Sequence, residues 1–207
     1  MNQKTIILIF TIVISIILSI YISLNELKEN DKLDDSDRIK ILNRGEEGIR
    51  LIPGYERIGR LQFKKIDNWI RKHPSSKMRI AQYSINVSDY KGELVVFSGI
   101  GGTPDQNINR WYKQFKIKPD ISNSEGMLKW DAISNGFNIK FVHFEGTYMK
   151  SDMQMNRISE ELENYGLLAA IIIGAHEPYY FKMTGPNLLI KSQKNIFEDF
   201  IKSVLEV

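Results

Sequence analysis

The sequence predicts an α+β protein in which an N-terminal transmembrane helix precedes one domain, an antiparallel sheet flanked by helices. Three observations predict this class. An uncharged apolar run opens the chain at residues 6–24. Strand-like segments follow, and two of them are joined by only five residues, a hairpin length that makes the sheet at least partly antiparallel. Two further segments repeat apolar residues at helical spacing behind helix-start signals.

The apolar run follows a short tail, residues 1–5, and contains no charge, proline or glycine. About 20 apolar residues cross the ~30 Å hydrocarbon core of a bilayer, so the run has the length of a transmembrane helix. The alternative is a cleaved signal peptide, whose apolar core of about 7–15 residues ends in a small-x-small site. The exit from the run, Ser19–Leu24, has no such site, which favours an uncleaved signal anchor.

Flanking charges bear on the topology of this anchor. Lys4 is the one basic side chain before the run, and four follow it within the next stretch: Lys28, Lys32, Arg38 and Lys40. A count of Lys and Arg alone would keep the C-terminal side inside. Large domains cross largely regardless of flanking charge, and a short basic N-terminus before an apolar run is the usual export signal. We therefore expect a single-pass protein of the cytoplasmic (inner) membrane, with its domain facing the periplasm or exterior.

A spacer and one domain are expected after the anchor. Residues 25–43 are rich in acids and bases and poor in apolar residues, which indicates a solvated spacer. The folded domain is expected at 44–207, a length at which a chain buries about 70% of its unfolded surface and can stand alone. The net charge of +3 is small and evenly spread, so nucleic acid is not expected as a partner.

The strands are expected where β-branched, aromatic and alternating residues concentrate. These segments are 78–87, 93–100, 137–144, 167–173 and 179–183, with a turn at Asn135-Gly136. The connection 174–178 joins the last two as the hairpin. Residues 151–165 have near-helical apolar spacing and are also compatible with a long loop, so they are left open.

Two helices carry clear signals. Thr103-Pro104-Asp105-Gln106 matches a capping box with proline at the first helical position. One apolar face follows it: Ile108, Trp111, Tyr112 and Phe115. Trp111 is expected in the core rather than as an exposed stacking platform. The last helix is expected after Thr184-Gly185-Pro186, with an apolar stripe of Phe197, Phe200, Ile201, Val204 and Leu205.

Five short strings occur in a recognisable order: MRIAQY at 78–83, GGTPDQNINRWYKQF at 101–115, GTY at 146–148, LLAAII at 167–172 and YYFKMTGP at 179–186. Together they resemble a family of uncharacterised bacterial exported or membrane-tethered proteins, over about residues 50–207. Met183 stands where the family pattern has leucine. The family is similar to the PsbP-like fold, an antiparallel sheet flanked by helices. The resemblance implies this fold and no activity. Many members are exported with a lipid-carrying cysteine, and this chain has no cysteine.

No catalytic, metal or cofactor motif is predicted. The absence of cysteine excludes thiolate metal sites and a cysteine nucleophile. His143 and Glu145 share a strand face, and His176 and Glu177 lie in the hairpin turn. These residue types could ligate a metal, but their spacing matches no metal motif, so a sheet face and a solvated turn are the expected roles.

The candidate ligand-binding residues are Arg79, Gly101, Gly102, Thr103 and Lys182. Glycines before a helix N-terminus could expose N–H groups to an anion, although a plain strand-to-helix turn is the simpler interpretation. Arg79 and Lys182 interrupt apolar strands, so they either face solvent at an edge or contact a ligand beside that turn.

These observations predict a membrane-anchored extracytoplasmic module that binds a protein or a small molecule without catalysing a reaction. The alternatives are a hydrolase or transferase with an unrecognised carboxylate or histidine site, and an assembly factor for a membrane complex.

We expect the protein to stay in the membrane fraction after high-salt and carbonate washing, because an apolar helix of this length is held by the hydrocarbon core. The intact mass of the purified protein checks the same point. A mass that lacks about the first 25 residues would show a cleaved signal peptide instead.

Overall fold

The computed structural model describes residues 51–117, 126–152, 157–174 and 176–207. The predicted tail, transmembrane helix and spacer lie outside the described residues and remain predictions, as does the start of the domain at residue 44. Within the described ranges, no helix is long and apolar enough to cross a membrane.

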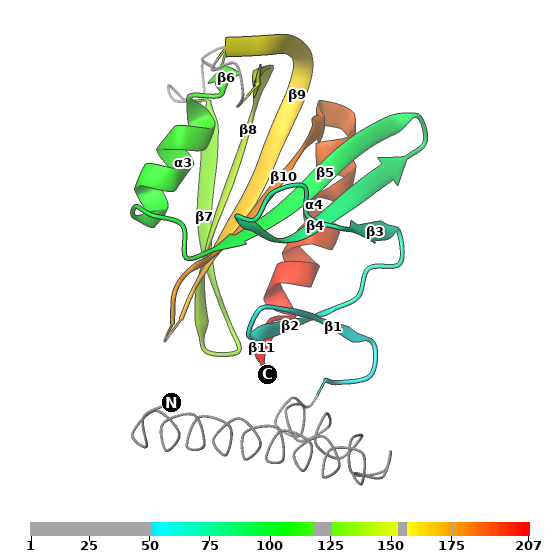
Figure 1. Ribbon diagram of the computed structural model, residues 1–207, viewed down its shortest axis with the longest axis vertical. Coiled ribbons are helices and arrows are strands. Elements are labelled where there is room, and N and C mark those ends of the chain that lie inside the picture. Colours follow the sequence, from blue (N-terminus) through cyan, green and yellow to red (C-terminus); the bar gives the residue numbers. More distant parts are fainter. Residues whose placement is uncertain (1–50, 118–125, 153–156, 175) are drawn as a thin grey trace, which may run out of the picture. The chain divides into compact units, whose positions relative to one another are not determined.

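Two antiparallel sheets and two helices make up the described part of the chain (Figure 1). The elements are β1 (Tyr55–Ile58), β2 (Leu61–Lys64), β3 (Trp69–Lys72), β4 (Arg79–Val87), β5 (Tyr90–Ser98), α3 (Pro104–Tyr112), β6 (Phe115–Lys116), β7 (Met127–Ser134), β8 (Phe137–Asp152), β9 (Arg157–Ile173), β10 (Tyr179–Pro186), α4 (Asn187–Lys202) and β11 (Leu205–Glu206). The larger sheet has the order β3-β4-β5-β10-β9-β8-β6, and β7 also pairs with β8. The smaller sheet has the order β1-β2-β11.

Both faces of the larger sheet are covered, so the domain has an apolar cluster on each side (Figure 1). On one face, α4 and the smaller sheet pack against the strands. On the other face, α3 packs over β8, β9 and β10. Side chains alternate along β10, so Phe181 points toward α4 and Tyr180 toward α3. The predicted α+β class with an antiparallel sheet flanked by helices is confirmed.

The predicted hairpin is also confirmed, because β9 and β10 pair antiparallel from Tyr179↔Ile172 onward. Asn135 and Gly136 both have positive φ, 49° and 84°, and they turn β7 into β8. Two positive φ angles are what a two-residue hairpin turn requires. The strand predicted at 93–100 begins earlier, at Tyr90, and ends at Ser98, before Gly99 with its φ of 65°.

The helix predicted to carry Phe115 on its apolar face ends three residues earlier, at Tyr112. The N–H of Lys113 closes the last turn on the Asn109 carbonyl, and Phe115 then pairs with Tyr148 as part of β6. The prediction of a longer helix was wrong. Phe115 belongs to the same apolar cluster as the helical residues Ile108 and Trp111, but it reaches that cluster from a strand. Similarly, α4 ends at Lys202, and Leu205 belongs to β11 rather than to the helical stripe.

The described residues of the segment left open at 151–165 are strand rather than helix or long loop. Strand β8 continues through Asp152, and β9 begins at Arg157. The register shifts between Gly146 and Tyr148 and again between Lys150 and Ser151. Such irregularities break the two-residue alternation of a strand, which is why the apolar spacing imitated a helix.

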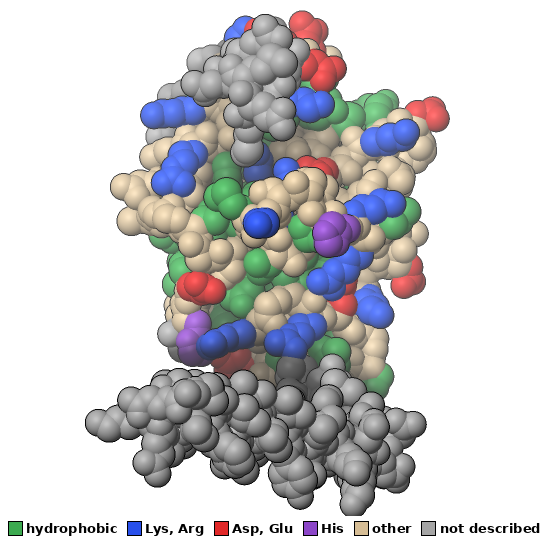
Figure 2. Space-filling view, in the orientation of Figure 1, with side chains coloured by type: hydrophobic (Ala, Val, Ile, Leu, Met, Phe, Trp, Pro, Cys, Tyr) green, Lys and Arg blue, Asp and Glu red, His purple; other side chains and the backbone are tan. Residues whose placement is uncertain are grey.

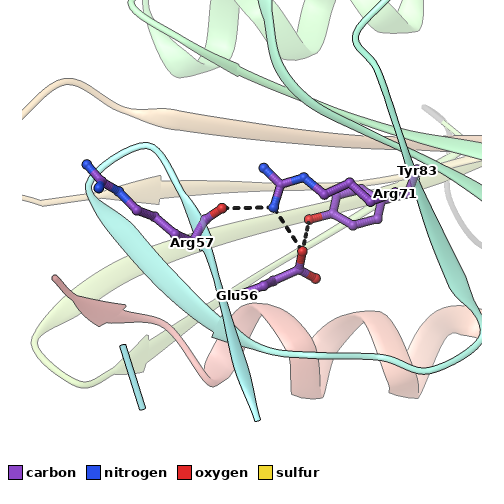
Figure 3. A network of polar contacts seen from close by, with 4 residues as sticks. All are labelled: Glu56, Arg57, Arg71 and Tyr83. Carbon is purple, nitrogen blue, oxygen red and sulfur yellow. Dashed lines mark hydrogen bonds and ion pairs between the residues drawn. The ribbon is translucent and has the colours of Figure 1, made fainter. Parts of the chain in front are cut away.

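A polar network ties the smaller sheet to the larger one (Figure 3). Oε2 of Glu56 on β1 accepts hydrogen bonds from Tyr83 Oη at 2.8 Å and from Arg71 Nη1 at 3.0 Å. Arg71 Nη1 also donates to the Arg57 carbonyl at 3.0 Å. Burial, with the negative charge of Glu56 beside it, raises the pKa of Tyr83 well above its ordinary value. The Tyr83 phenol therefore keeps its proton and remains a donor at neutral pH.

We expect Trp111→Ala to lower the free energy of unfolding by about 3–5 kcal/mol, because a large core side chain leaves a cavity. Trp111 is 6% exposed and packs edge-on against Tyr180 at 6.3 Å between ring centroids. Urea unfolding of the full chain measures the change. Ile133→Ala is the control, since Ile133 is 78% exposed. An unchanged midpoint for Trp111→Ala would contradict its role in the core.

Candidate functional site

A cleft of about 590 Å³ opens on the face of the larger sheet that α3 only partly covers. Strands β5 and β10 contribute Val95 and Lys182, α3 contributes Trp111, and β8 and β9 contribute Tyr148 and Tyr165. Figure 2 looks onto this side of the domain and shows apolar side chains with basic ones among and around them. The volume lies in the range of about 300–1,000 Å³ that is typical of sites for small molecules.

Lys182 is the most unusual residue of the cleft. It lies on β10 between Val95 of β5 and Ala169 of β9, and it is only 9% exposed. Its Nζ donates a hydrogen bond to Gln114 Oε1 at 2.6 Å and lies 5.6 Å from the centroid of the Tyr148 ring. Among the described residues, no carboxylate lies within salt-bridge distance of this ammonium group.

The electrostatic environment of Lys182 disfavours its charge. Burial, and next the positive charge of Arg79, lower its pKa from 10.5 to about 8, while Glu93 has a weaker opposing effect. The group still carries its proton at pH 7, so the cleft holds a buried ammonium that forms no salt bridge with a carboxylate of the described residues.

Arg79 stands near Lys182 at the start of β4. Its Nη1 pairs with Glu93 Oε1 at 3.1 Å, and the same oxygen accepts from Gln82 Nε2 at 2.6 Å. Glu93 is the one carboxylate among the described residues that line the cleft. The lining also includes Lys91, Arg110 and Lys150, so basic residues outnumber acids five to one.

The wall on the α3 side is positioned by the turn at 101–103. Thr103 Oγ1 accepts from the Gln106 N–H, and Gln106 Oε1 accepts from the Thr103 N–H, which completes the predicted capping box. Gly102 has a φ of 95°, and a Cβ there would lie 2.7 Å from Arg110 Nη2. The turn thus brings Arg110 close to its backbone, where Arg110 Nη1 donates to Asn107 Oδ1 at 3.0 Å.

Aromatic side chains form the opposite wall. The rings of Tyr148 and Tyr165 stack at 6.1 Å with an interplanar angle of 17°. Phe115 lies against Tyr148 at 4.9 Å and anchors it to the apolar cluster beneath α3. Burial raises the pKa of Tyr148, so its phenol stays neutral.

The structure brings two of the five sequence-predicted ligand residues together in the cleft, Arg79 and Lys182. Lys182 does not lie at a sheet edge, because β10 is central, and it is only 9% exposed where it lines the cleft. Gly101, Gly102 and Thr103 lie outside the lining and hold the start of α3. A ligand role for any of the five stays a prediction.

The histidines do not converge. His143 lies on β8 beneath α4, with Nε2 3.6 Å from Glu145 Oε1, and Asn187 of α4 also donates to Glu145. Burial lowers the pKa of His143, and the charge of Glu145 only partly opposes this effect. His176 is exposed in the β9–β10 turn. Among the described residues, no group of three potential metal-ligating side chains is found.

Sequence reasoning missed Glu93, Arg110, Gln114, Tyr148 and Tyr165 as members of one site. Gln114 and Tyr148 both lie in the quoted strings at 101–115 and 146–148, but nothing in those strings indicates that they meet at Lys182. The signal that pointed to the site was Lys182 itself, a charge inside an apolar strand.

No family model matches the chain, and no curated protein matches it. Among solved structures, it is similar to the solution structure of cyanobacterial PsbP (CyanoP) from Synechocystis sp. PCC 6803, with 11% sequence identity and a TM-score of 0.45. The match covers 76% of this chain and 95% of that one. This neighbour is a PsbP, the fold that the sequence resemblance implies. Nothing about the function of this chain follows from the similarity. The motif-bearing exported family remains a prediction.

We expect Lys182→Met to stabilise the domain at pH 7. Lys182 binds its proton less tightly in the folded state (pKa about 8) than in the unfolded state (10.5). Below pH 8 its charge therefore lowers the free energy of unfolding by up to ~3 kcal/mol. That cost disappears as the pH rises from 8 toward 10.5, and loss of the Gln114 hydrogen bond offsets part of the gain.

Urea unfolding at several pH values measures this difference. The midpoint of the variant should exceed that of the wild type at pH 7, and the gap should narrow by pH 10. Lys72→Met serves as the control, since Lys72 is an exposed strand lysine. A variant less stable than the wild type at pH 7 would show that the ammonium group stabilises the fold.

Proposed function

We propose that the protein is a membrane-anchored, extracytoplasmic binding module and that the cleft beside α3 is its ligand site. The observation that carries the proposal is Lys182, a buried ammonium in a cleft large enough for a small molecule. A buried charge without a counter-ion costs free energy, and a hydrophobic side chain at this central position would avoid that cost. Binding a ligand explains why the position is charged.

The lining favours binding over hydrolysis. General acid–base work on a glycoside or ester uses two carboxylates, or a base placed beside a nucleophile. The described lining offers Glu93 as its one carboxylate, already paired with Arg79, and includes no histidine.

The location is proposed from the sequence. Residues 6–24 supply the anchor and residues 25–43 a solvated spacer, so the domain would stand away from the bilayer surface. An anchored domain of this kind would bind ligands on the extracytoplasmic side of the membrane.

Native mass spectrometry of the full chain, purified from its membrane, tests the proposal. We expect the wild type to retain a small-molecule adduct and Val95→Phe to lose it. Val95 lies opposite Lys182 in the sheet register and lines the cleft, so a larger ring there fills the site.

Leu128→Phe is the matched control, because it adds the same ring at an exposed position on β7. Unfolding midpoints of both variants establish that they fold. Adducts that persist in Val95→Phe, or a wild type that carries none after incubation with a metabolite extract, would overturn the cleft as the ligand site.

A further inference from the structure

We propose that the ligand of this cleft is a small molecule with one carboxylate, bound at Lys182 and Arg79, and an aromatic or long aliphatic body. The inference rests on the proposed function and adds the chemical class of the ligand. Three features of the cleft support it: its charge balance, the donors left at Lys182, and the composition of the remaining walls.

The charges of Lys182, Arg79 and Glu93 favour a ligand with a single negative charge. Lys182 and Arg79 are both cationic at neutral pH, and Glu93 neutralises one of them through its 3.1 Å contact with Arg79. One positive charge remains, and it resides on Lys182, which is only 9% exposed. A monoanion neutralises this buried charge, whereas a neutral ligand leaves it unpaired. Lys91, Arg110 and Lys150 of the lining are exposed, so solvent and salt screen their charges.

The donors of Lys182 are only partly used. An ammonium group has three N–H donors and no acceptor. Gln114 Oε1 takes one of them at 2.6 Å, and the Tyr148 ring lies within cation–π distance at 5.6 Å. Within the described part of the chain, this leaves the group able to donate to a carboxylate oxygen entering from the cleft, where a charged hydrogen bond is strongest.

The other walls are apolar or aromatic. Trp111 closes one side, and the stacked pair of Tyr148 and Tyr165 closes the other. Val95 and Phe97 of β5 extend the apolar surface away from Lys182. A carboxylate fills a small part of a cleft of about 590 Å³, so most of the ligand surface meets these walls and must itself be apolar.

A set of matched probes tests this class on the full chain. Each probe is an aromatic or aliphatic carboxylate, from benzoate through N-acetyltryptophan and 1-pyrenebutyrate to dodecanoate, paired with its neutral carboxamide. Ligand-observed NMR and equilibrium dialysis measure binding. We expect hits among the acids, with each binding about tenfold or more tightly than its amide, and Lys182→Met to remove that preference.

Lys72→Met is the control variant, because Lys72 is an exposed strand lysine outside the cleft lining and its loss changes the net charge equally. It should leave acid binding within about twofold at 0.15 M salt, where exposed charges are screened.

The outcomes separate this inference from the proposed function. Acids and amides that bind alike, or acid binding unchanged in Lys182→Met, would overturn the carboxylate class while leaving the cleft as a binding site. Tighter binding of aryl phosphates than of acids would overturn the monoanion. Failure of every probe, acid and amide, to bind the wild type would count against the cleft as a ligand site and so against the proposed function itself.

Discussion

The burial of strand β10 on both faces governs the rest of the domain. It is paired with β5 and β9 along its edges and is covered by α4 on one face and by the α3 cluster on the other. A strand in that position is expected to be apolar throughout, and Phe181 and Met183 meet this expectation on the α4 face. Lys182 is the exception, and its ammonium group is held by Gln114 and the Tyr148 ring in the cleft.

The two faces of the larger sheet therefore differ in how completely they are packed. The α4 face is packed with aromatic and aliphatic side chains and is tied to the smaller sheet through Glu56 and Tyr83. The α3 face is only partly filled, because α3 spans nine residues and ends at Tyr112. That early end turns the chain so that Gln114 meets Lys182 and Phe115 supports Tyr148. The short helix thus leaves space for the cleft and at the same time supplies one of its polar groups.

Local signals in the sequence were enough to predict the class of fold, the capping box of α3 and the β9–β10 hairpin, because each depends on residues close together in the chain. They were not enough where long-range pairing decides the structure. Phe115 has helical spacing but is held in β6 by Tyr148, and the alternation in β9 is broken by register shifts against β8. Sequence patterns could indicate only single charged residues of the site, Arg79 and Lys182. Their companions come from four other elements and from the α3–β6 connection, which meet only in the folded chain.

The pairing of β11 with β2 has a consequence for the order in which the domain forms. The side chain of Gln62 donates to the carbonyl of Glu206 across 144 positions, and the backbone of Val207 bonds to Arg60. Strand β2 therefore has its outer edge closed only after β11 has been made. Contacts of such high sequence separation slow folding, so the smaller sheet is expected to close late.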